Sequence, residues 1–171
     1  MLVIILLYNR KRYYKFLPTI PLYPNNIKAS LKVLHISKSR NHQDDFFFKL
    51  TDPSVVFAFK PYVKETHNEL TKIILSINKI IFFFKYLFNR ARPEQINKEI
   101  NLLDSKTAAT PAFPAGHAMQ AYYLAKILTK RYPNKKSIFT KLAKDCDDVR
   151  VKAGIHYPSD GKFSKFLVKF L

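Results

Sequence analysis

Three short clusters in the second half of the chain contain side chains that could bind and transfer a phosphoryl group. The clusters run over Lys85–Pro93, Pro114–His117 and Arg150–Asp160. They hold basic side chains, two histidines, a carboxylate and a glycine at the expected start of a helix. Taken singly, each is more simply explained by surface charge, a loop hinge or a structural hydrogen bond. Their occurrence together in one chain is what points to phosphoryl transfer.

The basic side chains suit the phosphate itself. Phosphoryl transfer develops charge on three phosphate oxygens, which have to be held by cations. Lys85, Arg92 and Arg150 supply three of them. Gly116 falls where a helix should begin, so free backbone N–H groups can face an anion that approaches closely. These four residues predict a phosphate-binding site.

The two histidines suit the steps in which bonds are made and broken. A nucleophile needs an orienting partner, and Asp160, four residues after His156, can fix the tautomer of that imidazole. A second group must protonate the leaving oxygen, a task that suits a histidine near neutral pH. His117 is the candidate for it. The sequence shows no cluster of Cys, His and carboxylates of the kind that holds a metal, so we expect no metal site.

Helices predicted from periodicity would position these residues. The longest should run from about residue 67 to 89, because Thr66 and Glu69 form a capping box and apolar residues follow at helical spacing. Pro93 ends this element. Further helices are expected over 28–38, from 44 or 45 onward, from 116 or 117 to 132, from 134 onward, and from 159 or 160 to the end of the chain.

Composition predicts one all-α domain. The 171 residues suffice for one compact core, and 47% hydrophobic with 25% charged residues is an ordinary globular balance. Only three glycines occur, which favours helices over a turn-rich β fold. The single cysteine, Cys146, cannot form an internal disulfide.

The formal net charge of +18 predicts an anionic partner. Residues 1–43 contain no Asp or Glu, so we divide the chain into a basic, partly irregular N-terminal arm, residues 1–43, and a helical domain, residues 44–171. We expect the partner to be a phosphorylated small molecule or a lipid phosphate. The arm also predicts a peripheral contact with anionic membrane, whereas nucleic acid fits less well. Much of the charge is also explained by a solvated, lysine-rich surface.

The sequence predicts no membrane-spanning segment. The opening apolar run Leu2–Tyr8 is shorter than the roughly 20 residues that a span needs, and its charges follow it, where a secretory signal has them first. Lys79 and Lys85 interrupt the apolar stretch 73–88. We therefore expect a cytoplasmic or peripheral membrane protein without a signal peptide.

The three clusters, in their order along the chain, resemble the signature of the superfamily of type 2 phosphatidic acid phosphatases and vanadium-dependent haloperoxidases. That signature reads Lys-x6-Arg-Pro, then Pro-Ser-Gly-His, then Ser-Arg-x5-His-x3-Asp. The first part is intact here, whereas Ala115 and Val149 stand where the second and third parts have serine. The resemblance covers residues 67–171, and the first 60 or so match no family that we recognise.

The resemblance implies a fold and three catalytic roles. The fold is an all-α, single-domain helical bundle with the site between its core helices. His156 is implied to be the nucleophile that becomes phosphorylated, with Asp160 orienting it. His117 is implied to act as the acid for the leaving group and then as the base for the attacking water. The function implied is a metal-independent phosphatase that works through a phosphohistidine intermediate.

The same resemblance assigns the phosphate contacts. Lys85, Arg92 and Arg150 are implied to bind phosphate oxygens, with the Gly116 amide beside them. Ala115 occupies the position whose serine donates a hydrogen bond to the phosphate in the family. Losing a bond to a charged group costs on the order of 1.5–3 kcal/mol, or roughly tenfold to hundredfold in rate. None of the groups that make or break bonds is lost with it.

Two alternative functions stay open at this point. A vanadium-dependent haloperoxidase uses the same constellation with vanadate in the phosphate pocket. We favour the phosphatase because a short chain leaves little material for a halide and organic-substrate cavity, so we expect no cofactor, with vanadate only in the haloperoxidase case. The second alternative is a weakly active or inactive relative that acts as a basic anion- or nucleic-acid-binding protein, because two motif serines are missing.

Overall fold

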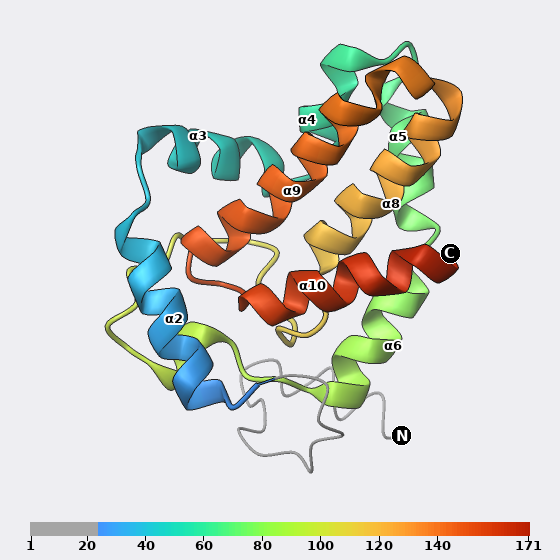
Figure 1. The fold of residues 1–171 in the computed structure, drawn as a ribbon. Helices are drawn as coiled ribbons and strands as arrows, with labels where there is room; N and C mark the ends of the chain where they lie inside the picture. Colours follow the sequence, from blue (N-terminus) through green and yellow to red (C-terminus); the bar gives the residue numbers. More distant parts are fainter. Residues whose placement is uncertain (1–23) are drawn as a thin grey trace.

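Helices α8 (Gly116–Arg131) and α9 (Lys136–Lys152) form the central antiparallel pair of the bundle, joined by the short turn η2 (Pro133–Lys135). In the computed structural model, which describes residues 24–171, every regular element of that range is helical (Figure 1). The remaining elements are α2 (Asn26–Lys38), α3 (His42–Thr51), α4 (Val56–Phe59), η1 (Lys60–Tyr62), α5 (His67–Leu75), α6 (Asn78–Phe88), α7 (Pro93–Ile96), α10 (Pro158–Leu167) and η3 (Val168–Phe170). The all-helical expectation is confirmed.

Polar side chains set where several of these helices begin. Thr66 accepts a hydrogen bond from the Glu69 amide while Glu69 accepts one from the Thr66 amide, so the capping box predicted at the start of α5 is confirmed. Asn41 and Asp44 form the same arrangement at the start of α3. Each box satisfies backbone donors that a helix end leaves without partners.

The expectation of one long helix over residues 67–89 is wrong, because the chain breaks between α5 and α6. The hydroxyl of Ser76 donates to the Ile73 carbonyl at 2.7 Å, and such a local bond competes with helical pairing. Packing requires the break as well. Leu70 and Ile74 enter the main core with α8 and α9, whereas the next apolar residues join a second cluster. That cluster contains Ile77, Ile81, Met119 and Val168.

The described part of the N-terminal arm packs against the domain. Helix α2 contacts α7 and α9, and its Val33 is buried with Ile100, Val151 and Tyr157. Residues 1–23, which include Pro18 and Pro21 of the expected irregular segment, lie outside the described residues. The division of the chain at residue 43 stays a prediction.

The sequence predicted that the chain has no membrane-spanning segment. Within residues 24–171, none of the helices combines the length and the apolar character needed to cross a membrane.

Candidate active site

The predicted site residues come from the ends of five helices that meet in the interior (Figure 1). Lys85 lies in the last turn of α6, and Arg92 is the residue before α7. Ala115, Gly116 and His117 lie at the start of α8, and Arg150 lies in the last turn of α9. Asp160 lies in the first turn of α10, and His156 comes just before that helix. Helix ends present unsatisfied backbone groups and short connections, which lets side chains from distant segments converge.

His156 and Asp160 form the predicted pair. Nδ1 of His156 lies 3.0 Å from Oδ2 of Asp160, and both side chains are buried. The same Oδ2 accepts the Tyr157 amide at 2.9 Å, which fixes the carboxylate at the start of α10. With Nδ1 donating to Asp160, the lone pair of a neutral His156 imidazole lies on Nε2.

Burial and neighbouring cations keep His156 neutral. Loss of solvent lowers the pKa of His156 well below its ordinary value, and the charges of Arg92 and Lys85 lower it further. The Ala112 carbonyl opposes this shift, because it can accept the second ring N–H that only the protonated imidazole has while Nδ1 donates to Asp160. A neutral imidazole at neutral pH is the form that can act as a nucleophile.

Arg90 completes this group and was not among the predicted site residues. Its guanidinium donates to Asp160 Oδ1 at 2.6 Å and to Ser159 Oγ at 2.8 Å, and Nε donates to Asn26 Oδ1 at 2.9 Å. The guanidinium carbon also lies 3.8 Å from the centre of the Tyr157 ring. Burial raises the pKa of Asp160, and the charge of Arg90 opposes that rise. One more arginine in so basic a chain gave no distinguishing sequence signal.

Lys85 and Arg92 are held by backbone carbonyls. The Lys85 ammonium donates to the Pro111 carbonyl. Arg92 donates from Nε to the Thr110 carbonyl at 2.8 Å and from a terminal nitrogen to the Ile155 carbonyl at 2.7 Å. Burial, together with the nearby charge of Arg92, lowers the pKa of Lys85 well below its ordinary value. An anion placed between these groups would relieve that electrostatic cost.

Arg150 is paired with a carboxylate that the sequence analysis did not single out. A terminal nitrogen of Arg150 lies 2.7 Å from Asp52 Oδ1, which also accepts the hydroxyls of Ser105 at 2.6 Å and Thr107 at 3.1 Å. The Asp52 carbonyl lies 3.0 Å from Nε2 of His117. Asp52 therefore touches two predicted site residues.

His117 titrates lower than its residue type indicates. Burial lowers the pKa of His117 to about 3, with the charge of Arg150 acting in the same direction. The sequence-based expectation that His117 titrates near neutral pH assumed the ordinary pKa of histidine, which does not include the effects of burial and of Arg150. A phosphate dianion among the same cations would raise the pKa of His117 again, since an opposite charge favours the protonated imidazole.

The start of α8 is locked between α6 and α10. Ala115, the N-cap residue, is fully buried, and its carbonyl accepts the Ser164 hydroxyl at 2.9 Å. A side-chain carbon added at Gly116 would lie 3.4 Å from Ile81 and 3.5 Å from Lys85. Helix α8 therefore begins directly beside Ile81 and the aliphatic chain of Lys85, at van der Waals distance.

A pocket of about 350 Å³ adjoins this region. Its lining includes Arg92 and Ile155 from the site and apolar side chains of the loop before α8. Those apolar residues are Leu102, Leu103, Ala108 and Ala109. The pocket thus places a cation of the site beside an apolar wall, and Glu94 and Asp104 also line it.

Comparison of the sequence with known protein families identifies the family of this chain. The model of the PAP2 superfamily matches residues 69–167, more than half of the chain. The chain belongs to the PAP2 superfamily. All predicted site residues, from Lys85 to Asp160, fall within the matched range. Asn26 and Asp52, which contact the site in the structure, fall outside it.

Solved PAP2 structures share the fold. The crystal structure of Aquifex aeolicus LpxE is similar with a TM-score of 0.63 and 22% identity, covering 89% of this chain and 94% of that one. The first transmembrane PAP2 type phosphatidylglycerolphosphate phosphatase from Bacillus subtilis is similar with a TM-score of 0.55 and 20% identity, covering 90% and 87%. No curated protein matches the sequence significantly. The family and the helical fold predicted from the motifs are confirmed.

Proposed function

We propose that this PAP2 chain is a phosphatase that hydrolyses phosphomonoesters through a phosphohistidine on His156, without a metal ion. The observation that carries the proposal is the neutral, buried His156, oriented by Asp160 and lying among cationic side chains. Those cations are Lys85, Arg92 and Arg150, and the charge of each lowers the pKa of His156. Cations held in place before the reaction stabilise developing phosphoryl charge without reorganisation.

The chemistry divides into two displacements. In the first, Nε2 of His156 attacks phosphorus, the bond from phosphorus to the ester oxygen breaks, and His117 gives its proton to the leaving alcohol. In the second, His117 takes a proton from water, the water oxygen attacks phosphorus, and the phosphorus–nitrogen bond breaks. Inorganic phosphate leaves, and both histidines return to their starting protonation. Binding of the substrate dianion supplies the pKa rise that His117 needs in the first step.

A lipid phosphate fits the site better than a small polar phosphate. The pocket beside Arg92 offers an apolar wall formed by Leu102, Leu103 and Ala108. An apolar group next to the ester oxygen could lie there while the phosphate meets the cations. The Bacillus subtilis relative is named for its action on phosphatidylglycerolphosphate, which agrees with this choice.

Phosphate release from a panel of phosphomonoesters tests the proposal. The panel includes phosphatidic acid in detergent micelles and nitrophenyl phosphate, each with EDTA and with and without orthovanadate. We expect release that survives EDTA, stops with orthovanadate and is absent from His156→Ala. Loss of activity with EDTA and its recovery with a divalent metal would overturn the metal-independent mechanism. Faster halide oxidation by the vanadate-loaded protein than phosphate release would make it a haloperoxidase.

Rapid quenching tests the covalent step. The parent protein should accumulate a phosphoenzyme that is labile to acid and stable to base, as a phosphohistidine is. His156→Ala should abolish the label, whereas His117→Ala should retain it. Label recovered on a serine or an aspartate would show that His156 is not the nucleophile.

A further inference from the structure

Helix α10 and the turn η3 that follows it carry lysine and phenylalanine in adjacent pairs. The pairs are Lys162-Phe163, Lys165-Phe166 and Lys169-Phe170. Steps of three and four residues place like side chains on one face of a helix, so the lysines form one stripe and the phenylalanines the neighbouring stripe. All three lysines are exposed, and Phe166 and Phe170 are 50% and 73% exposed.

The phenylalanine stripe continues onto α6. Phe163 meets Phe84 with ring centres 5.8 Å apart, and Phe84 meets Phe83 at 5.3 Å. Towards the end of the chain, the rings of Phe166 and Phe170 are 5.1 Å apart. Phe83 is 63% exposed. Figure 1 shows α6 and the end of α10 next to each other at the lower right of the molecule. An exposed apolar strip that spans two helices is unusual on a monomeric protein and marks a contact surface.

The two segments that carry this strip contribute charge of one sign, although Asp147 and Asp148 line a pocket beside Lys162 and Lys165. Neither residues 70–93 nor residues 161–171 contain an Asp or a Glu. A groove of about 520 Å³ between α2 and α10 adds Lys28 and Lys32 to Lys162, with Phe163 at its edge. Basic side chains beside exposed aromatic rings are complementary to anionic lipid headgroups above an acyl layer.

We propose that this aromatic–lysine face docks on a membrane surface that contains anionic phospholipid. We define the face by Phe83, Phe166, Phe170, Lys162, Lys165 and Lys169. Its rings enter the boundary between headgroups and acyl chains, and its lysines contact lipid phosphates. The inference goes beyond the proposed function, because binding does not require turnover.

The aromatic–lysine face is connected to the candidate site through Phe163, whose ring centre lies 6.2 Å from that of Phe166. Phe163 stacks on Phe113 with ring centres 4.6 Å apart, and Phe113 comes two residues before Ala115 at the start of α8. Docking through this face would therefore hold the site close to the lipid surface.

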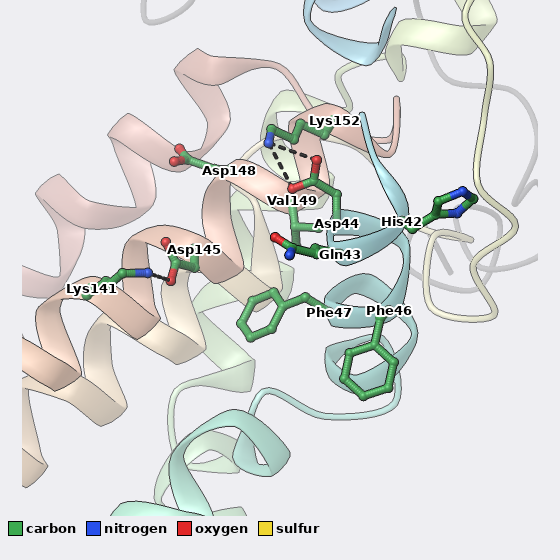
Figure 2. Close-up of a pocket in the computed structure, with 10 residues that line it drawn as sticks. All are labelled: His42, Gln43, Asp44, Phe46, Phe47, Lys141, Asp145, Asp148, Val149 and Lys152. Atoms are coloured by element: carbon green, nitrogen blue, oxygen red, sulfur yellow. Dashed lines mark hydrogen bonds and ion pairs between the residues drawn. The ribbon is translucent and has the colours of Figure 1, made fainter. Parts of the chain in front are cut away.

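A pocket between α3 and α9 differs from the aromatic–lysine face in its charge (Figure 2). It also has an exposed phenylalanine, Phe46, which is 70% exposed. Its charges are paired, since Lys152 pairs with Asp44 of α3 across the pocket and Lys141 pairs with Asp145 along α9, as Figure 2 shows. This surface lacks complementarity to an anionic membrane, and Phe46 is therefore a matched control.

The test measures binding of the full chain to vesicles of phosphatidylcholine alone or with one-third phosphatidylglycerol. We expect binding only with phosphatidylglycerol. It should fall at least tenfold in the lysine triple Lys162→Gln, Lys165→Gln, Lys169→Gln and in the double Phe166→Ser, Phe170→Ser. The triple Lys64→Gln, Lys130→Gln, Lys136→Gln makes the same charge change at exposed sites elsewhere, and this triple and Phe46→Ser should change binding less than twofold.

A fluorescent reporter locates the contact independently of affinity. The chain contains no tryptophan, so Phe170→Trp and Phe46→Trp each introduce a single indole. The first should shift to the blue and be quenched by brominated acyl chains on vesicle binding, and the second should not. Equal losses in the two lysine triples, or quenching in neither variant, would overturn the proposal. So would self-association without vesicles that Phe166→Ser, Phe170→Ser removes, because the face would then bind a second copy of the chain.

Discussion

Arg90 and Asp160, seventy residues apart in the sequence, form an ion pair of 2.6 Å in which neither side chain is exposed. The pair joins the loop after α6 to the first turn of α10. Its carboxylate is the one that orients His156. Arg90 therefore acts on the proposed nucleophile through Asp160 and is a positioning residue.

Removing the charge of Arg90 should change the pH dependence of catalysis. Without it, burial raises the pKa of Asp160 further, and a protonated carboxyl group is a poorer acceptor for His156. In Arg90→Gln, we expect the acidic limb of the kcat profile to move to higher pH and kcat to fall roughly tenfold or more, with KM little changed. Arg90→Lys should restore part of the profile. Arg131→Lys, at an exposed ion pair with Glu65, is the control. A loss of folded protein with an unchanged profile in the remainder would leave Arg90 a purely structural role.

Asp52→Asn should strengthen binding of phosphate-like anions. Burial alone would raise the pKa of Asp52, but hydrogen bonds from Ser105 and the charge of Arg150 hold it below its usual value, so the carboxylate is ionised at neutral pH. It then neutralises Arg150, on which the proposed mechanism depends for a phosphate oxygen. Without that negative charge, we expect the inhibition constant of orthovanadate to fall about tenfold at low salt.

Asp104→Asn is the matched control for this change. It makes the same charge change beside the 350 Å³ pocket, but the carboxylate is exposed. It should alter the inhibition constant by less than twofold, since solvent screens exposed charge. Weaker inhibition in Asp52→Asn would contradict the prediction and indicate that Asp52 mainly holds Arg150 in position.

Truncating His117 should affect substrates according to their leaving groups. A nitrophenolate departs with little protonation, whereas an alkoxide requires a proton from the acid. In His117→Ala, we expect the rate on an alkyl or lipid phosphate to fall roughly hundredfold more than that on nitrophenyl phosphate. Equal losses on both substrates in single-turnover measurements would mean that His117 does not protonate the leaving oxygen.

Ala115→Ser should act on both stability and rate. A serine at this N-cap position can accept a backbone N–H of α8, which adds about 1 kcal/mol of stability. A hydroxyl that also reaches the phosphate should raise kcat/KM roughly tenfold without changing the shape of the pH profile. Combining it with His156→Ala should keep the gain in Tm and abolish activity. Should parent and variant both be inactive on every phosphoester, the site would be a relic.

The buried Asp147 should make the free energy of unfolding depend on pH, and this effect does not involve catalysis. Burial raises its pKa to about 7, Tyr122 donates to its Oδ2 at 3.0 Å, and within residues 24–171 its Oδ1 has no hydrogen-bond partner. The unfolded carboxyl titrates near pH 4, so the unfolded state is the first to lose the proton as pH rises. Stability should therefore fall between about pH 4 and pH 7.

Urea unfolding of Asp147→Asn at two pH values measures this effect. At pH 8 the variant should be more stable than the parent by on the order of 2–4 kcal/mol, and at pH 5 by only about 1 kcal/mol. Asp145→Asn, in an exposed pair with Lys141, serves as the control. An equal difference at both pH values would exclude titration of Asp147 as the cause.

The sequence by itself determined the family, the helical class and several helix starts. These features depend on residues close together in the chain. Lys85 with Arg92 and His156 with Asp160 are each separated by a few residues, and the Thr66–Glu69 box is a single helical turn. Such spacings have the same meaning wherever they occur, so they could be read without coordinates.

Only the tertiary structure decided which groups surround the proposed nucleophile and how they titrate. The contacts of Arg90 with Asn26, of Arg90 with Asp160, and of Arg150 with Asp52 span 64, 70 and 98 residues. No local spacing encodes them, because they depend on how α2, α3, α9 and α10 pack. The low pKa of His117 and the break between α5 and α6 have the same origin: burial and packing act through neighbours that are distant in the sequence.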